Sequence, residues 1–158
     1  CDGVEWKKGD LFISANEPST IFLYRPDEDK LIWFKQGPWS AQHDIDILSE
    51  YEISIYDNNL NNESKPDPFN RVVIYNFKEN STSFPNYQLF KEYKIDSETQ
   101  SLHSIKDDIL FVEEQNESNL FIFHMEKNLL LWKLTHNSKI QWSKIYSEDE
   151  LKNFGFSL

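Results

Sequence analysis

The chain has 158 residues, the length of a single domain. Its 5 Trp, 7 Tyr and 12 Phe, against only 4 Gly and 6 Pro, argue against disorder and favour β-sheets, because aromatic rings suit a pleated, half-buried surface. The formal net charge of -11 argues against nucleic-acid binding, since phosphate contacts need a basic surface. One cysteine and the lack of an apolar run of about 18 residues predict neither an internal disulfide nor a membrane helix.

Short apolar or alternating runs recur about every 8 to 12 residues, bounded by Asn, Asp, Glu, Pro or Ser, which is typical of β-strands. Helical periodicity is nearly absent. We predict ten strands, at residues 10–14, 20–25, 30–35, 43–48, 52–57, 71–77, 101–105, 109–113, 120–124 and 129–134. Only the tail, residues 147–154, predicts a helical turn, because Ser147 and Glu150 have the spacing of a capping box.

Two stretches far apart in the chain follow one template of three apolar runs that ends in tryptophan. The step from Leu11 to Trp33 is 22 residues, and the step from Ile109 to Trp132 is 23. Self-similarity of this kind indicates a repeat architecture. We expect Trp132 to repeat the role of Trp33, closing the outer edge of its unit.

The repeat predicts an all-β fold built from β-propeller-like blades of antiparallel strands, within a single domain of residues 1–158. The units cover about residues 4–40, 41–98 and 99–146, followed by a tail at 147–158, and each must stack on its neighbours to bury its faces. A closed propeller has four to eight blades, whereas this chain supplies about three to four. It is therefore part of a longer propeller, half of a ring assembled from two copies, or a smaller irregular sandwich. Residues 58–70 predict a surface loop.

Several motifs point to one family. They are Gly9-Asp10-Leu11-Phe12-Ile13-Ser14, a Gly37-to-Leu48 segment containing Gln42-His43-Asp44, then Asp57-Asn58-Asn59 and Arg71-Val72-Val73-Ile74-Tyr75. This series resembles the bacterial arylsulfotransferase family, in which a Q-H-D stretch leads to a strand, a D-N motif and S-R-V-x-x-Y. The resemblance extends over about residues 2–146.

The resemblance implies a propeller enzyme that moves a sulfuryl group from a phenolic sulfate to a phenol through a transiently sulfated histidine. No cofactor and no metal are expected. It makes His103 the candidate nucleophile and His43 a sulfate-contacting residue, with Asp44, Gln42 and Asn58 binding or orienting the substrate. The family's arginine after the D-N motif has no counterpart, and no histidine precedes His43. The active-site set is therefore incomplete within this chain.

Other interpretations stay open. A histidine in a strand is usually structural, and His124 and His136 are expected to be structural or exposed. Asp46 is expected to face water, whereas Asp44 is the better partner for an imidazole. If the histidines are structural, the chain is a non-catalytic propeller module. A further alternative is an acidic periplasmic lipoprotein that binds a basic protein, as the net charge and Cys1 suggest. A fragment boundary is the alternative explanation of Cys1. The partners considered are a phenolic sulfate or other small molecule, a protein, and a second copy in a homodimer.

Overall fold

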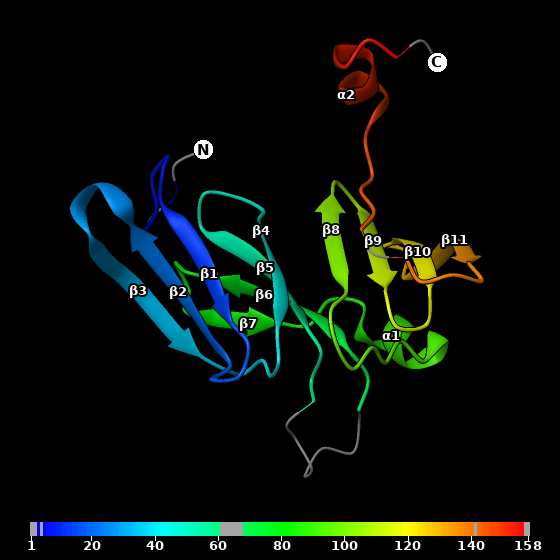
Figure 1. Cartoon of the computed structure of the whole chain (residues 1–158), viewed down its shortest axis with the longest axis horizontal. Coiled ribbons are helices and arrows are strands. Elements are labelled where there is room, and N and C mark those ends of the chain that lie inside the picture. The colour runs from blue at the N-terminus through cyan, green and yellow to red at the C-terminus, as the bar shows by residue number, and fades with distance from the viewer. Residues whose placement is uncertain (1–2, 4, 61–67, 141, 157–158) are drawn as a thin grey trace.

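A computed structural model of the chain describes residues 3, 5–60, 68–140 and 142–156. Within these residues, three antiparallel sheets follow one another along the chain (Figure 1). The first contains β1 (Leu11–Ala15), β2 (Thr20–Arg25) and β3 (Lys30–Gln36), with a short 3-10 turn (Pro26–Glu28) between the last two. The second contains β4 (His43–Ile47), β5 (Glu52–Asp57), β6 (Arg71–Asn76) and β7 (Ser81–Ser83). The third contains β8 (Leu102–Lys106), β9 (Ile109–Glu114), β10 (Asn119–His124) and β11 (Leu129–Thr135).

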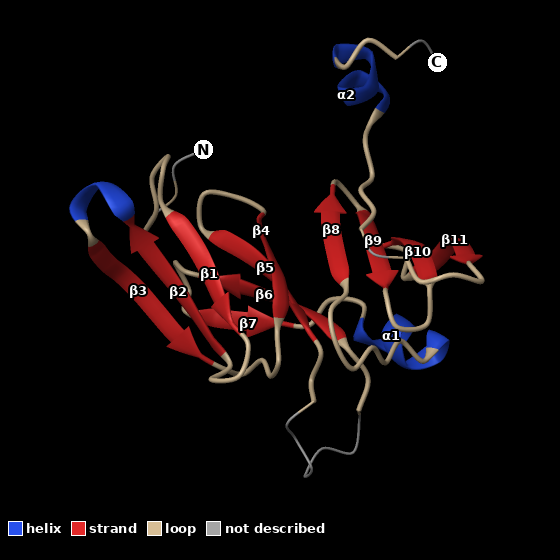
Figure 2. Ribbon diagram, viewed as in Figure 1, coloured by secondary structure: helices blue, strands red, loops and turns tan. Residues whose placement is uncertain are grey.

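The two helices lie outside the sheets (Figure 2). Helix α1 (Tyr87–Tyr93) connects the second sheet to the third, and α2 (Glu148–Asn153) ends the C-terminal extension. No helix among the described residues is both long and apolar enough to cross a membrane. Inside the stack, β4 contacts β1 on one side and β8 on the other. The inner strands of the second and third sheets are therefore neighbours, as in a propeller, and β4 also borders the first sheet at β1.

Two hydrophobic clusters fill the two junctions between the sheets. Ile53 and Ile55 of β5 pack toward the first sheet, against Ile21 and Leu23 of β2. Tyr56 of the same strand belongs to the other cluster, with residues of β9, β10 and α1. Because successive side chains of a strand point to opposite faces, β5 is buried on both sides. The expectation that each unit stacks on its neighbours is confirmed at both junctions.

All ten predicted strands are confirmed, with ends that differ by one residue at most. The capping box is confirmed as well, since the Ser147 hydroxyl accepts from the backbone of Glu150 and the Glu150 carboxylate accepts from the backbone of Ser147. The chain thus forms propeller-like blades of antiparallel strands.

The sequence interpretation missed two elements, α1 and β7, and its limitation of helix to the tail is wrong. Helix α1 has seven residues and no side-chain cap, too short to be stable alone. Its buried Leu89 and Phe90 hold it against the second core cluster. Strand β7 is Ser81-Thr82-Ser83, which carries no apolar alternation. Both elements exist because of tertiary contacts.

The segment predicted as a surface loop, residues 58–70, is anchored at both ends. Residues 61–67 of this segment lie outside the described residues. Asn58, Asn59 and Asn70 are buried. The side-chain amide of Asn70 donates to the carbonyl of Asn58 at 2.9 Å. The ends of the segment are therefore part of the polar interior.

Candidate functional site

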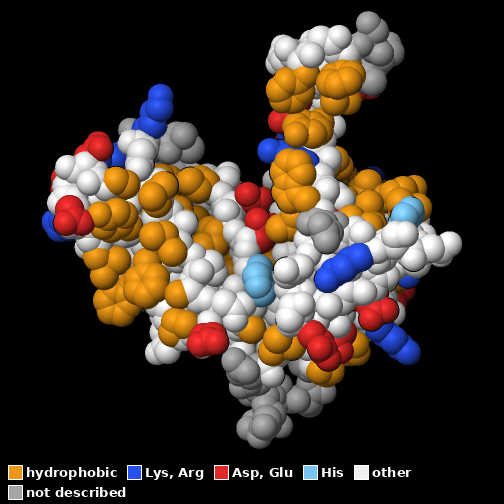
Figure 3. Space-filling model, in the orientation of Figure 1, with side chains coloured by type: hydrophobic (Ala, Val, Ile, Leu, Met, Phe, Trp, Pro, Cys, Tyr) orange, Lys and Arg blue, Asp and Glu red, His pale blue; other side chains and the backbone are white. Residues whose placement is uncertain are grey.

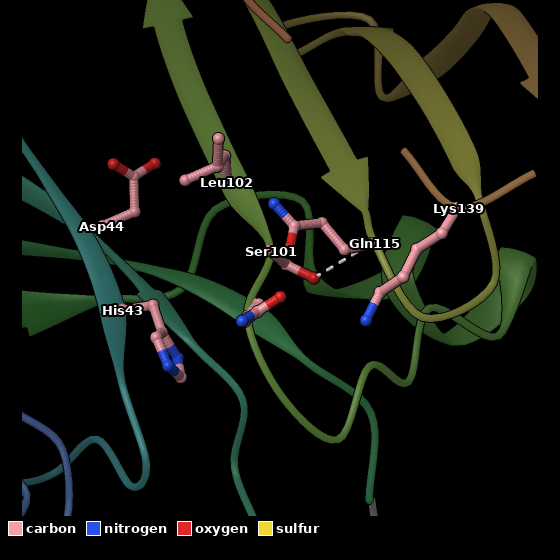
Figure 4. Close-up of a pocket in the computed structure, with 7 residues that line it drawn as sticks. His43, Asp44, Ser101, Leu102, Gln115 and Lys139 are labelled. Carbon is pink, nitrogen blue, oxygen red and sulfur yellow. Dashed lines mark hydrogen bonds between the residues drawn. The ribbon is translucent and has the colours of Figure 1, made fainter. Parts of the chain in front are cut away.

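A polar cavity of about 430 Å³ opens between the second and third sheets (Figure 4). Figure 4 shows His43 on one side of it and Lys139 on the other, with Ser101 and Gln115 between them. The wall is built from the start of β4, the segment before β8, the turn after β9 and the segment after β11. The lining residues are His43, Asp44, Gln100, Ser101, Leu102, Gln115 and Lys139.

His43 is the imidazole of this cavity, and a hydrogen-bond network fixes its tautomer. The Asn58 amide donates to the carbonyls of Ser97 and Gln100, at 2.8 and 3.1 Å. Its Oδ1 therefore faces His43 Nδ1, 2.7 Å away, and this ring nitrogen must donate. Nε2 is then left with a lone pair, which accepts from Asn16 Nδ2 at 3.1 Å. We assign a neutral imidazole whose basic nitrogen is Nε2.

The buried carboxylate of Asp57 holds the turn that carries Asn58. Its Oδ1 accepts from the backbone amides of Ser40 and Asn59, at 2.8 and 2.9 Å, and its Oδ2 accepts from Arg71 Nε at 2.7 Å. Arg71 also donates to the carbonyl of Pro38. Three charge-assisted hydrogen bonds on one carboxylate make a rigid support. The D-N motif therefore orients His43 from behind, and Arg71 is engaged in this support.

Asp44 sits at a β-bulge of β4, where its φ is +46°. A bulge re-aims a side chain out of the ordinary alternation. The Asp44 carboxylate crosses to the third sheet and accepts from the backbone N–H of His103 at 2.7 Å and from its Nδ1 at 3.1 Å. Asp44 is thus the partner of an imidazole, as expected, but the imidazole is that of His103.

His103 is enclosed between the second and third sheets. Its side chain is 0 % exposed, and its Nε2 lies 2.8 Å from Ser54 Oγ. Ser54, His103 and Asp44 have the connectivity of a Ser-His-Asp triad, yet Ser54 is also 0 % exposed. Because a nucleophile must reach its substrate, the buried Ser54 offers no reactive hydroxyl. The three hydrogen-bonded residues instead link β5, β8 and β4.

Gln42 is buried at the first junction and lines neither the large cavity nor the smaller one described next. Its amide donates to Ser14 Oγ at 3.0 Å and to the carbonyls of Ala15 and Thr20 at 2.9 and 3.2 Å. These bonds tie the start of β4 to the first sheet. Gln42 therefore supports the backbone on which His43 sits.

A smaller cavity of about 160 Å³ lies beside the first, lined in part by Asp44, Asp46, His103, Trp142 and Lys144. Asp46 is half-buried here rather than facing open water as expected. Burial raises the pKa of the Asp46 carboxyl, the nearby His103 lowers it, and Asp44 raises it.

The five predicted site residues divide into two groups. His43 and Asp44 line the large cavity, whereas Gln42, Asn58 and His103 are buried behind or beside it.

The sequence interpretation did not identify Asn16, Ser54, Gln115 and Lys139. Asn16 and Gln115 occupy turns, where polar residues are ordinary, and Ser54 sits in a strand with no motif around it. Lys139 follows the third sheet and carries no pattern that marks it. Among the described residues, no group of three or more His, Cys, Asp or Glu side chains is arranged to hold a metal ion.

Stacked four-stranded sheets whose inner strands carry histidines beside a polar cavity define a β-propeller-like protein. The sequence model of the family described as Arylsulfotransferase (ASST) matches residues 3–136, a range that includes all three sheets. The chain therefore belongs to the arylsulfotransferase family, and the resemblance seen in its motifs is confirmed. A search of curated proteins found no match.

Proposed function

We propose that this protein transfers sulfuryl groups between phenolic sulfates and phenols, with His43 as the residue that carries the group. Family membership supports the reaction class. The observation that carries the residue assignment is the Asn58 hydrogen bond, which puts the proton on His43 Nδ1 and leaves Nε2 basic at a cavity of about 430 Å³.

The proposed reaction has two displacements at sulfur. His43 Nε2 attacks the sulfur of the donor, the bond from sulfur to the phenolic oxygen breaks, and the phenolate leaves with the electron pair. The sulfated imidazole keeps its proton on Nδ1, where it stays hydrogen-bonded to Asn58 Oδ1. The acceptor phenol then attacks the same sulfur, loses its proton to solvent, and releases His43 in its original state. Ping-pong kinetics follow from such a covalent intermediate.

Two groups near His43 are suited to the sulfate oxygens. Asn16 Nδ2 donates to Nε2 and can transfer this hydrogen bond to a sulfate oxygen once Nε2 attacks. The Lys139 ammonium lies across the cavity and forms no ion pair with any described residue. Donors aimed at charge that develops in the transition state supply much of the rate enhancement in such sites.

The proposal moves the nucleophile from His103 to His43. Attack by His103 would require breaking its bond to Ser54 inside a junction where its side chain is 0 % exposed. We assign His103 the role of a positioning residue that fixes Asp44 and joins the sheets.

The test is transfer from 4-nitrophenyl sulfate to phenol, followed by release of 4-nitrophenolate. We expect His43→Ala to lower kcat about 10²-fold or more, because it removes the nucleophile. His136→Ala is the matched control, since His136 is exposed and its ring, among the described residues, bonds only to the backbone of Ser138. Undiminished transfer by His43→Ala would refute the assignment.

A non-catalytic module that binds aryl sulfates is the second candidate. It is favoured by the engagement of Arg71 with Asp57, which leaves Lys139 as the one cation among the described residues that line the large cavity. Binding of phenyl sulfate measured by calorimetry, with no release of 4-nitrophenolate from its nitro analogue, would establish this function and exclude the enzyme.

A further inference from the structure

The first sheet has three strands, whereas the second and third have four. The alignment of the repeats shows which strand is missing. Strand β1 corresponds to β9, which is the second strand of its sheet, so the first sheet lacks the counterpart of β4 and β8. Among the described residues, β1 pairs with β2 alone. Its other edge carries backbone groups that can accept a further strand.

Residues 142–146 follow the last strand of the third sheet at the distance along the chain at which an inner strand is expected, but among the described residues they belong to no sheet. The step from the end of β11 at Thr135 to Trp142 equals the step from the end of β3 at Gln36 to His43, seven residues in each case. The side chains from 142 to 147 alternate between exposed and half-buried, as in an extended strand. The segment shares a cavity wall with β8, yet within the described part of the chain it pairs with no strand.

Both ends of the stack of sheets present apolar faces. Of the fifteen exposed large hydrophobic side chains among the described residues, four lie on β1 and β3 and four on β11. On the first sheet, Ile13, Phe22 and Phe34 form one cross-strand row on the face away from the core. Figure 3 shows hydrophobic side chains gathered over this sheet and along the C-terminal extension. Apolar patches of this kind mark interaction surfaces. The exposed residues of the two faces are Leu11, Ile13, Leu31 and Phe34, and Leu129, Leu131, Trp132 and Leu134.

We propose that two copies of this chain close a single ring. Residues 142–146 of each copy pair with β1 of the other copy as the missing inner strand, and the outer face of the third sheet packs on the outer face of the first. The same contact occurs twice, related by a two-fold axis. The result is six four-stranded sheets, within the range of four to eight in closed propellers.

A second copy fits this place because the chain holds both halves of the contact in equal number. It offers one strand without a sheet and one sheet without its inner strand, and one apolar face at each end of the stack. Each copy therefore satisfies the open edge of the other. The inference rests on backbone pairing and apolar faces and does not depend on sulfuryl transfer.

Light scattering of the full chain tests the proposal, and the expected mass is twice the 18.9 kDa of one chain. Ile13→Lys places a charge on the outer face of the first sheet, where Ile13 is 44 % exposed, and is expected to give a folded monomer. Leu60→Lys is the matched control, because Leu60 is 42 % exposed and lies on neither face. Circular dichroism verifies that both variants keep the fold.

Hydrogen exchange tests the strand pairing separately from the mass. Amides in residues 142–146 are expected to exchange at least about tenfold more slowly in the wild-type chain than in Ile13→Lys, because donated strands form backbone hydrogen bonds. A monomeric wild-type chain would overturn the proposal. So would a dimer with unprotected amides in this segment, and so would open-ended assemblies larger than two chains.

Discussion

The first and third sheets follow one sequence template and place its tryptophan at the same position, yet a neighbouring sheet covers only one of the two rings. Trp33 lies opposite Leu23 and stacks on Tyr75, with ring centroids 5.5 Å apart and planes at 29°. Trp132 lies opposite Ile122 and is 44 % exposed. The expectation that Trp132 repeats the role of Trp33 at the outer edge of its unit is confirmed for its position, since β3 and β11 are the outer strands of their sheets, but only Trp33 packs on a neighbouring sheet.

The two tryptophans share the same place in the repeat, including a neighbouring β-bulge. In the first sheet the extra residue of the bulge is Ile32, next to Trp33, and in the third it is Leu131, next to Trp132. Since side chains alternate with a period of two, both tryptophans lie on the same face of their repeat unit. That face of the first sheet packs on the second sheet, whereas the third sheet packs on the second with its other face. The face that carries Trp132 therefore lies at the end of the stack of described sheets.

The largest expected effect comes from truncating the two tryptophans. We expect Trp33→Ala to lower the free energy of unfolding by about 3 kcal/mol, because it opens a cavity in the core between the first and second sheets. Trp132→Ala should cost less than about 1 kcal/mol in a dilute, monomeric sample. Urea denaturation measures both. Equal losses would show that the two rings are covered to the same extent.

The next effect concerns the junction with the third sheet. His103→Ala removes the ring bonded to Asp44 and Ser54, and we expect a loss of about 2 kcal/mol in the free energy of unfolding. The exposed His136→Ala serves as control and should change it by less than about 0.5 kcal/mol. Unchanged stability together with lost sulfuryl transfer would instead make His103 a catalytic residue.

The smallest effect is an acid-sensitive ion pair found in the first sheet and absent from its repeat. Arg25 binds both carboxylate oxygens of Asp10, at 2.8 and 2.7 Å, and lowers the pKa of Asp10 from 3.8 to about 2. The positions equivalent to this pair in the third sheet are Ile109 and His124, which form no ion pair with each other. The pair stabilises the fold above pH 3.8, and this contribution disappears as the pH falls toward about 2.

Asp10→Asn should therefore lower the urea midpoint at pH 6 and leave it nearly unchanged at pH 2, so that the acid limb of the stability profile becomes flatter. Asp108→Asn is the matched control and should keep the wild-type profile. An identical flattening in both variants would contradict the assignment of the acid limb to the pair with Arg25.

The candidate site was only partly predictable. His43 and Asp44 could be located from the Gln42-His43-Asp44 motif, and both line the large cavity. The motif could not reveal that Gln42 points into the first junction. Nor could it show that His103, which lies near the start of an inner strand as His43 does, bonds to the buried Ser54 and does not line the large cavity. Access depends on neighbours from other sheets, and no local pattern records them.

The sequence by itself determined the strands, the capping box at Ser147 and the family. Each of these depends on residue types at successive or fixed short spacings, which act before any long-range contact forms. The tertiary structure alone decided which histidine reaches the large cavity, where α1 forms, and which of the two tryptophans a neighbouring sheet covers. These outcomes depend on contacts between sheets, such as that of Asp44 with His103, 59 residues apart.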